Sequence, residues 1–185
     1  LYDAMCEAVA ETSEEMMDKY FSGEPLSEEE VREGLRTSVL AGEVYPIVCG
    51  SATKNIGIPT LLNYIIDYMP APDDLNAMVG KNVQTGAKVE IFTNDKDPFS
   101  AYVFKTIVDP YSGVINLFKI NSGTIKSGDE VKVSNGDTVK ISALYVMTGK
   151  NLNAVDELHA GDIGAVTRLE KVSSGMTLSS PKHVI

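Results

Sequence analysis

Hydrophobic residues recur at helical spacing through the first third of the chain. One series predicts a helix over residues 1–21, and a capping box of Thr12 with Glu15 predicts a break near residue 12. A second capping box, Ser27 with Glu30, opens a helix that is expected to stop at Gly42. The apolar positions of these helices are Leu1, Met5, Val9, Met16, Tyr20, Val31, Leu35, Val39 and Leu40.

The pattern changes at Val44–Cys49, a short and nearly continuous apolar run. Such a run predicts a strand that is covered on both faces. It ends in the small residues around Ser51, and an apolar helical face follows from Pro59, whose missing N–H suits the first turn of a helix. Pro70-Ala71-Pro72 then ends this helix, and residues 71–75 are expected to form a stiff, extended linker between domains.

From about Lys88 the hydrophobic period changes from 3.6 to 2, which predicts strands separated by turns. The strongest hairpin signal is Asn135-Gly136, for which we expect a type I′ turn. Six or seven short strands at this spacing predict a closed or nearly closed antiparallel barrel over residues 76–182. The predicted strands are Lys88–Phe92, Phe99–Val108, Gly113–Ile120, Glu130–Val133, Thr138–Val146, Ile163–Leu169 and a short one near Thr177–Leu178.

The formal net charge of −10 is concentrated in the predicted helices. Residues 1–46 carry twelve acidic side chains against three basic ones, whereas the remaining residues carry fourteen against thirteen. The acidic part argues against nucleic-acid contact there and forms either a solvated helical surface or a docking face for a basic partner. The residues after 46, in which acidic and basic side chains are nearly equal in number, could still carry a local basic patch.

The two cysteines and the hydropathy pattern limit the chemistry further. Cys6 and Cys49 have no nearby Cys or His, so we expect no metal site and interpret both as small buried residues in a reducing cytoplasm. No apolar run approaches the length that a membrane span requires. Because Leu1 lies inside a predicted helix, we expect the chain to be an internal segment of a longer, cytoplasmic protein.

The loop at Ser51-Ala52 has the local order strand, tight loop, helix, where ligands bind in open α/β sheets. A backbone N–H at this point could donate to the O6 of guanine, and adenine would place an amino donor there instead, a mismatch of about 1–3 kcal/mol. Small side chains would let the backbone come close, and Lys54 could pack along the plane of the base. An ordinary strand-to-helix turn is the alternative, and the dipeptide by itself does not distinguish the two.

The surrounding motifs resemble those of bacterial translation elongation factor G, and they cover nearly the whole chain in the family's order. The loop motif runs from Val48 to Ile58 and is followed by Leu61-Leu62 and by Asp67-Tyr68-Met69-Pro70-Ala71-Pro72. Before it, two further stretches are similar to the helical subdomain of that factor: Met16-Met17-Asp18-Lys19-Tyr20 with Gly23-Glu24, and Ser27-Glu28-Glu29-Glu30. After it, the stretches that are similar to its second domain are Phe104-Lys105, Asp109-Pro110-Tyr111-Ser112-Gly113, Ser122–Gly128 and Ala160–Val166.

The resemblance implies an α+β, multi-domain fragment. Residues 1–70 would be the C-terminal part of a GTPase domain, with an acidic helical insert over 1–43 and the last strand, guanine loop and helix over 44–70. An antiparallel Greek-key β-barrel of the elongation-factor domain II type would follow the linker. The implied function is a part of a ribosome-dependent GTPase, in elongation factor G or an elongation-factor-G-like paralogue, that promotes translocation of tRNA and mRNA.

The resemblance also implies residue roles and partners. Ser51, Ala52 and Thr53 would contact the guanine base of GTP or GDP, which the full-length parent would bind with magnesium. The acidic insert would bind the ribosomal stalk protein, and the barrel would rest on small-subunit ribosomal RNA. No DNA or membrane partner is implied, and the fragment is expected to be monomeric and to have no cofactor bound.

Several GTPase motifs are absent from the sequence. No G-x-x-x-x-G-K-[ST] phosphate loop occurs, because Gly123–Gly128 is followed by Asp129, and Asn94-Asp95-Lys96-Asp97 has the wrong order for the Asn-Lys-x-Asp guanine motif. With the switch segments also missing, we expect no catalytic residues and no GTP hydrolysis by this chain. His159, with Asp156 and Glu157 close by, could form a metal site or an acid–base pair, but a solvent-facing loop histidine is the simpler interpretation.

Three alternatives remain open at this point. A ribosomal protection protein or a release-factor-three-like GTPase would share the barrel, although the long acidic insert before Ser51 favours elongation factor G. A free-standing interaction module would use the acidic helices to bind a basic protein and would have no GTPase role. An enzyme with its own site would need a convergent nucleophile, base or metal cluster, and the sequence contains no such pattern.

Overall fold

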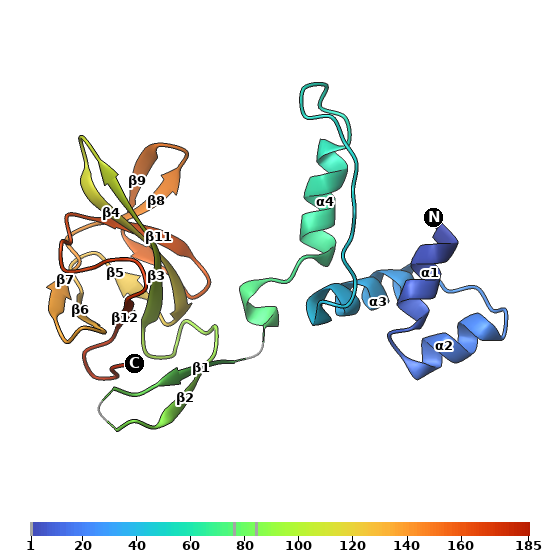
Figure 1. The fold of residues 1–185 in the computed structure, drawn as a ribbon, viewed down its shortest axis with the longest axis horizontal. Coiled ribbons are helices and arrows are strands. Elements are labelled where there is room, and N and C mark those ends of the chain that lie inside the picture. Colours follow the sequence, from blue (N-terminus) through green and yellow to red (C-terminus); the bar gives the residue numbers. More distant parts are fainter. Residues whose placement is uncertain (1, 76, 84) are drawn as a thin grey trace. The chain divides into compact units, whose positions relative to one another are not determined.

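The computed structural model describes residues 2–75, 77–83 and 85–185, and it divides into two compact units, Leu1–Leu75 and Asn76–Ile185. The first unit is helical and the second is built of strands (Figure 1). No helix in the described ranges is both long enough and apolar enough to cross a membrane.

The helical unit packs amphipathic helices around a small core. Its helices are α1 (Tyr2–Ala10), α2 (Glu14–Phe21), α3 (Glu28–Ala41) and α4 (Ile58–Tyr68). Cys6 and Val9 of α1 meet Val31 and Leu35 of α3, with Leu26 from the loop before α3. The predicted burial of Cys6 is therefore confirmed.

Helix caps follow the local sequence at two of the three predicted sites. Ser27 and Glu30 form the predicted capping box, and α3 ends at Gly42 in the left-handed conformation, as expected. The box predicted for Thr12 is wrong. Ser13 caps α2 by accepting the N–H of Met16, while the Thr12 hydroxyl donates to the carbonyl of Val9. Helix α2 therefore begins one residue later than the sequence pattern indicates.

The predicted strand at Val44–Cys49 is also wrong. This segment has no strand pairing in the structure, Tyr45 is 80% exposed and Ile47 is 90% exposed. Cys49 is exposed, which contradicts the expectation that it is buried. The helix α4 carries no buried residue, and Ile66 on it is 74% exposed. A strand needs a neighbour to supply its hydrogen bonds, and none of the described segments pairs with this one.

The predicted extended linker contains a 3₁₀ turn, η1 (Pro72–Asp74). The Asp74 carboxylate accepts the N–H of Ala71 at 2.8 Å and pairs with Arg36 of α3 at 2.8 Å. The Ala71 N–H bond, followed by the Arg36 charge, lowers the pKa of Asp74. The connection after α4 is therefore fixed to the helical unit, and it is not an extended rod.

The second unit is an eight-stranded antiparallel sheet that curls around one core (Figure 1). The sheet order is β7-β6-β12-β3-β4-β11-β8-β9, and the return of β12 and β11 beside earlier strands gives the Greek-key connections that the resemblance to elongation factor G implies. Small pairs β1–β2 and β10–β5 complete the unit. The strands are β1 (Met78–Lys81), β2 (Lys88–Ile91), β3 (Ser100–Asp109), β4 (Gly113–Ser122), β5 (Ile125–Lys126), β6 (Glu130–Val133), β7 (Thr138–Lys140), β8 (Leu144–Thr148), β9 (Asn151–Val155), β10 (Glu157–Leu158), β11 (Ile163–Thr167) and β12 (Thr177–Ser179).

The inner face of the sheet holds the larger hydrophobic core. Val103, Phe118, Ile120 and Leu178 on the central strands are fully buried, and Ile141 and Leu144 join them from the segment around β8. The alternation of apolar and polar residues therefore sets which side chains point inward. The α+β fold class and the barrel predicted from the sequence are confirmed.

Two local details of the barrel differ from the sequence expectation. The predicted strand Thr138–Val146 is broken into β7 and β8, and strands β1, β5, β9 and β10 were not expected. The β6–β7 hairpin does not use a type I′ turn, because Asn135 has a negative φ and only Gly136 is left-handed, at φ 96°. Its bonds run from Gly136 N–H to Val133 O and from Val133 N–H to Asp137 O, as in a three-residue hairpin loop.

Glu30 should make the helical unit sensitive to acid. The Lys19 ammonium at 2.6 Å and the Ser27 N–H at 2.7 Å lower the pKa of Glu30 from 4.5 to about 2. A lowered pKa stabilises the fold above the unfolded-state value, and this contribution disappears as the pH falls from 4.5 towards about 2. Glu30→Gln should therefore lower the melting temperature of the helical signal at pH 7 and change it little near pH 2, as measured by circular dichroism.

The matched control is Glu29→Gln on the same helix turn, whose side chain is exposed and has no ion pair in the described residues. Equal pH profiles for the two variants would contradict the role given to Glu30.

Candidate functional site

The loop that connects the extended segment 44–50 to α4 is closed by two backbone hydrogen bonds. The N–H of Ser51 donates to the Ile56 carbonyl at 2.9 Å, and the N–H of Ile56 donates back to Ser51 at 3.0 Å. Within this bridge, the Asn55 N–H donates to the Ala52 carbonyl at 3.2 Å, and Asn55 takes a left-handed φ of 53°. Asparagine tolerates this conformation better than most residues. The loop is therefore defined by its own backbone.

Two glycines let the legs of the loop approach each other. A Cβ on Gly50 would lie 2.8 Å from the Ile56 carbonyl oxygen, and one on Gly57 would lie 2.9 Å from that of Cys49. Gly57 is also left-handed, at φ 77°, and it is the residue from which α4 starts, with Pro59 in the first turn as predicted. The tight loop expected from the sequence is present, even though the strand before it is not.

The predicted guanine-binding residues lie side by side in this loop, but their N–H groups differ. Ser51 is partly buried and its N–H is used in the bridge to Ile56. Ala52, Thr53 and Lys54 are exposed, and their N–H groups have no acceptor in the described part of the chain. The Lys54 ammonium has no ion pair among the described residues either. The donor available to a ligand is thus the N–H of Ala52 or Thr53, and not that of Ser51.

The donors of this loop are too few to hold a nucleotide by themselves. A neutral hydrogen bond contributes about 1 kcal/mol net, whereas millimolar affinity already requires roughly 4 kcal/mol. The loop offers a few backbone donors and one lysine. Any nucleotide that it contacts must therefore be held mainly by other residues.

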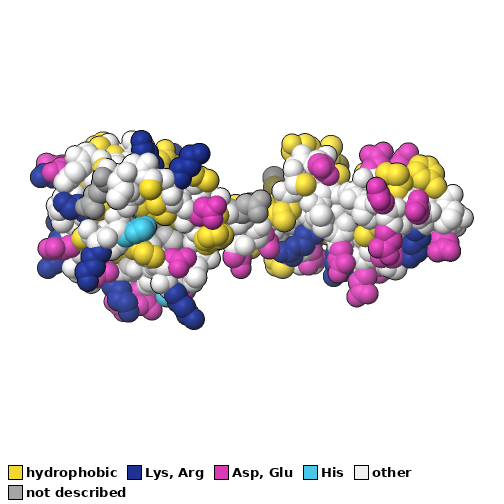
Figure 2. Space-filling model, turned by 90° about the horizontal axis from the view of Figure 1, so that it is seen from below, with side chains coloured by type: hydrophobic (Ala, Val, Ile, Leu, Met, Phe, Trp, Pro, Cys, Tyr) yellow, Lys and Arg dark blue, Asp and Glu magenta, His cyan; other side chains and the backbone are white. Residues whose placement is uncertain are grey.

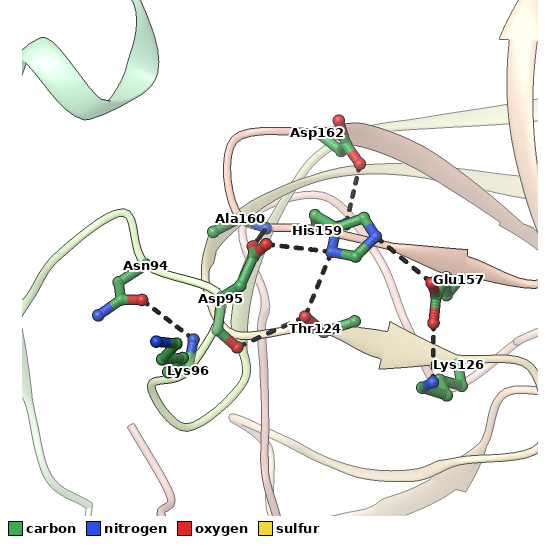
Figure 3. Close-up of polar contacts among 9 residues, drawn as sticks. All are labelled: Asn94, Asp95, Lys96, Thr124, Lys126, Glu157, His159, Ala160 and Asp162. Carbon is green, nitrogen blue, oxygen red and sulfur yellow. Dashed lines mark hydrogen bonds and ion pairs between the residues drawn. The ribbon is translucent and has the colours of Figure 1, made fainter.

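His159 lies in a polar cluster on the barrel unit (Figure 3). Its Nδ1 is 3.2 Å from Asp95 Oδ2, and its Nε2 is 3.6 Å from Glu157 Oε1. Glu157 pairs with Lys126 at 2.8 Å, and this bond lowers the pKa of the carboxyl and raises that of the ammonium. The sequence pattern suggested Asp156 and Glu157 as neighbours but did not indicate Asp95, which is far away along the chain.

The contacts of this cluster connect loops and do not form an open site. Asp95 Oδ1 accepts the N–H of Ala160 at 2.9 Å, and Asp162 Oδ2 accepts the N–H of His159 at 2.8 Å. The bonds of Asp95 fasten the loop before β3 to the turn before β11, and the Asp162 bond closes that turn. Over residues 2–75, 77–83 and 85–185, no group of three or more His, Cys, Asp and Glu side chains could hold a metal ion. The interpretation of His159 as a loop histidine agrees with its partly exposed side chain.

A hollow of about 520 Å³ at another end of the barrel was not found from the sequence. Its lining includes Tyr111, Tyr145 and Arg168, together with the hydroxyls of Ser112, Ser142 and Thr167, and it includes no acidic side chain. Arg168 takes a φ of 60°, which strains a residue of this type, and its guanidinium has no ion pair in the described residues. Tyr111 is 94% exposed at the tip of the β3–β4 hairpin.

Asp109 closes the turn at the tip of this hairpin. Asp109 Oδ1 accepts the N–H of Ser112 at 2.7 Å and that of Tyr111 at 2.9 Å, and these bonds lower the pKa of Asp109. The exposed ring of Tyr111 therefore projects from a turn whose backbone is hydrogen-bonded. An unpaired cation, an exposed aromatic ring and several hydroxyls suit an anionic, planar ligand such as a nucleic acid. The turn itself was visible in the sequence, but its proximity to Arg168 was not.

Comparisons with known proteins assign the barrel. Residues 98–180 match the family model described as elongation factor G domain 2. A crystal structure of a protein from Thermus thermophilus is 30% identical in sequence, with a TM-score of 0.71, over 94% of this chain and 24% of that chain. This chain therefore spans about a quarter of the length of that protein. The barrel unit is a domain II of the elongation-factor type, which supports a role in translation.

Substitution of Gly57 should open the loop at residues 50–57. In Gly57→Ala, the left-handed φ costs about 1–2 kcal/mol, and the new Cβ would also press on the Cys49 carbonyl, 2.9 Å away. Amide hydrogen exchange of Ser51 and Ile56 should accelerate by roughly tenfold or more. The measurement is hydrogen exchange followed by NMR.

Gly23→Ala is the control, because Gly23 has a similar φ of 84° and no atom within 4 Å of its added Cβ. It should leave the exchange of Ser51 and Ile56 unchanged. Unaltered protection of these two amides in Gly57→Ala would show that the bridge does not depend on the close approach.

Proposed function

We propose that this chain is part of a ribosome-dependent translational GTPase that promotes translocation of tRNA and mRNA. The observation that carries the proposal is the match of the barrel to elongation factor G domain 2, directly after a helical unit that contains the tight loop at residues 50–57 and the helix α4. The likeness to the Thermus thermophilus structure over 94% of the chain supports both units together. The parent protein would act in the cytoplasm and hydrolyse GTP with residues that this sequence does not contain.

In the proposed site, the Ala52 N–H donates to the O6 of guanine. The Ala52 N–H has no acceptor in the described residues, which supports this role, whereas the Ser51 N–H is already bonded within the loop. Ser51 and Thr53 would frame the edge of the base, and the unpaired Lys54 would pack along its plane. The parent would bind GTP or GDP with magnesium, and the phosphates and the ion would be held outside this chain.

The exposed apolar surface of the helical unit supports a larger nucleotide domain. The extended segment 44–50 has no strand partner among the described residues, and Tyr45, Ile47, Ile65 and Ile66 are all exposed on this segment and on α4. Large exposed apolar patches usually mark surfaces that another part covers. We infer that the remaining sheet of a GTPase domain pairs with this segment and covers α4.

The acidic helices would bind the ribosomal stalk protein. Figure 2 shows Asp and Glu side chains gathered on the helical unit. Glu28 and Glu29 are exposed at the start of α3 and have no ion pair in the described residues, whereas Glu30 is engaged by Lys19 and Ser27. A basic partner would therefore meet Glu28 and Glu29 and not Glu30.

Charge reversal at Glu28 and Glu29 tests this contact. The double variant Glu28→Lys, Glu29→Lys should weaken binding to isolated stalk protein by about tenfold or more at low salt, because two favourable charge contacts become repulsive. Isothermal titration calorimetry measures the affinity. Glu43→Lys with Asp67→Lys makes the same charge change elsewhere on the unit, and an equal loss in this control would exclude a local contact.

The barrel would contact small-subunit ribosomal RNA through the hollow around Arg168 and Tyr111. The unpaired guanidinium of Arg168 can bind a phosphate group, and the exposed ring of Tyr111 can stack on a base that is turned out of its helix. The experiment is co-sedimentation of the chain with small ribosomal subunits. Arg168→Ala and Tyr111→Ala should each reduce the bound fraction. If a base stacks on Tyr111, the loss in Tyr111→Ala corresponds to about 1–3 kcal/mol of binding free energy.

Lys150→Ala is the control, since Lys150 is exposed and has no ion pair among the described residues. If the wild-type chain does not sediment with ribosomal subunits at all, the translational role is contradicted. If it sediments and both hollow variants match the wild type, the RNA contact lies on another face.

A free-standing interaction module is the second candidate. This candidate is supported only by the acidic surface, and it does not explain why the apolar side chains of α4 are exposed. A ribosomal protection protein or a release-factor-three-like GTPase would share the barrel and would still sediment with ribosomes.

A further inference from the structure

A second concave surface of the barrel unit is apolar and lies away from the hollow at Arg168. The β1–β2 hairpin arches over the outer face of the sheet and leaves a groove of about 570 Å³. Val79 and Ile91 of the hairpin line one wall, and Tyr102, Phe104 and Ile163 of the sheet line the other. Val79 is 67% exposed, and the three sheet residues are also exposed. We name this surface the hairpin groove.

The floor of the hairpin groove is a row of side chains in strict register. Thr177 on β12 pairs with Tyr102 on β3, Tyr102 pairs with Lys119 on β4, and Lys119 pairs with Ile163 on β11. Neighbours across an antiparallel sheet stand about 5 Å apart. The stem of Lys119 thus lies between an aromatic ring and an isoleucine, with its ammonium at an apolar surface.

The charges around the hairpin groove are unbalanced. No acidic side chain lines it, and Lys119 has no ion pair in the described residues. At the end of the hairpin, Lys81 and Lys88 stand directly opposite each other, an arrangement that repels. The only acidic residue of the hairpin, Glu90, forms no ion pair with either lysine.

We propose that the hairpin groove binds an extended peptide segment of a partner protein in which hydrophobic residues alternate with Asp or Glu. The hydrophobic side chains would enter between the hairpin and the row Tyr102–Lys119–Ile163. The carboxylates would meet Lys119, which lines the groove and forms no ion pair in the described residues. The nearly continuous apolar lining favours peptide side chains over nucleotides, because a base needs polar partners along its edge. This binding site is independent of the proposed translational function.

The test uses the full chain and the model peptide Glu-Leu-Glu-Phe-Glu-Leu-amide, labelled with fluorescein on its N-terminal amine, with fluorescence anisotropy as the readout. We expect saturable binding below about 1 mM and much weaker binding of the counterpart with Lys in place of Glu. Lys119→Glu and Tyr102→Ser should each weaken binding of the acidic peptide about tenfold or more. Lys150→Glu, the same charge change on the β8–β9 turn, should change it less than about twofold.

Four results of the peptide measurements would overturn the proposal. They are no binding of the acidic peptide, equal binding of the basic peptide, an equal loss in Lys150→Glu, and displacement of the peptide by an oligouridine RNA. A concentration-dependent dimer in sedimentation equilibrium that Lys119→Glu abolishes would also overturn it, because a second copy would then occupy the groove. Circular dichroism shows whether each variant is folded, and Lys119→Glu should sediment with ribosomal subunits as the wild type does.

Discussion

The barrel depends on the long antiparallel pairing of β3 with β4. This pair extends from Ser100 opposite Ser122 to Asp109 opposite Gly113, with two register shifts on the way. Its inner face supplies Val103 and Phe118, which are fully buried in the core. Its outer face supplies Tyr102 and Lys119 to the hairpin groove, and its tip presents Tyr111 beside the hollow. One hairpin therefore fixes the core and both candidate surfaces, because alternate residues of a strand must point to opposite faces.

The loop of the helical unit is organised by contacts within the loop itself. This loop, at residues 50–57, is held by two reciprocal bonds between Ser51 and Ile56 and by close contact at Gly50 and Gly57. These constraints are local, so the loop keeps its form although the extended segment before it pairs with nothing in the described chain. A binding loop that is organised by its own backbone can be rigid while the apolar surface around it remains available to further elements.

The distribution of charge differs between the two units. Residues 1–75 contain fifteen acidic and four basic side chains, and residues 76–185 contain eleven and twelve. The acidic unit repels RNA and suits basic proteins, whereas the nearly neutral barrel can concentrate unpaired cations such as Arg168 and Lys119 on particular faces. Net charge alone would have suggested a single acidic surface.

The sequence by itself determined the features whose causes lie within a few residues. The capping box of Ser27 and Glu30, the end of α3 at Gly42, and the bounds of β6 at Glu130–Val133 all follow from local hydrogen bonding and alternation. The ordered motifs also indicated the domain II barrel and the loop at Ser51. Only the tertiary structure decided whether Val44–Cys49 pairs with another strand, because the local sequence pattern does not identify the neighbouring strand that such pairing requires. It also decided the contact of His159 with Asp95, the hollow at Arg168 and the row from Thr177 to Ile163, since each joins residues that are distant in sequence and is set by sheet register.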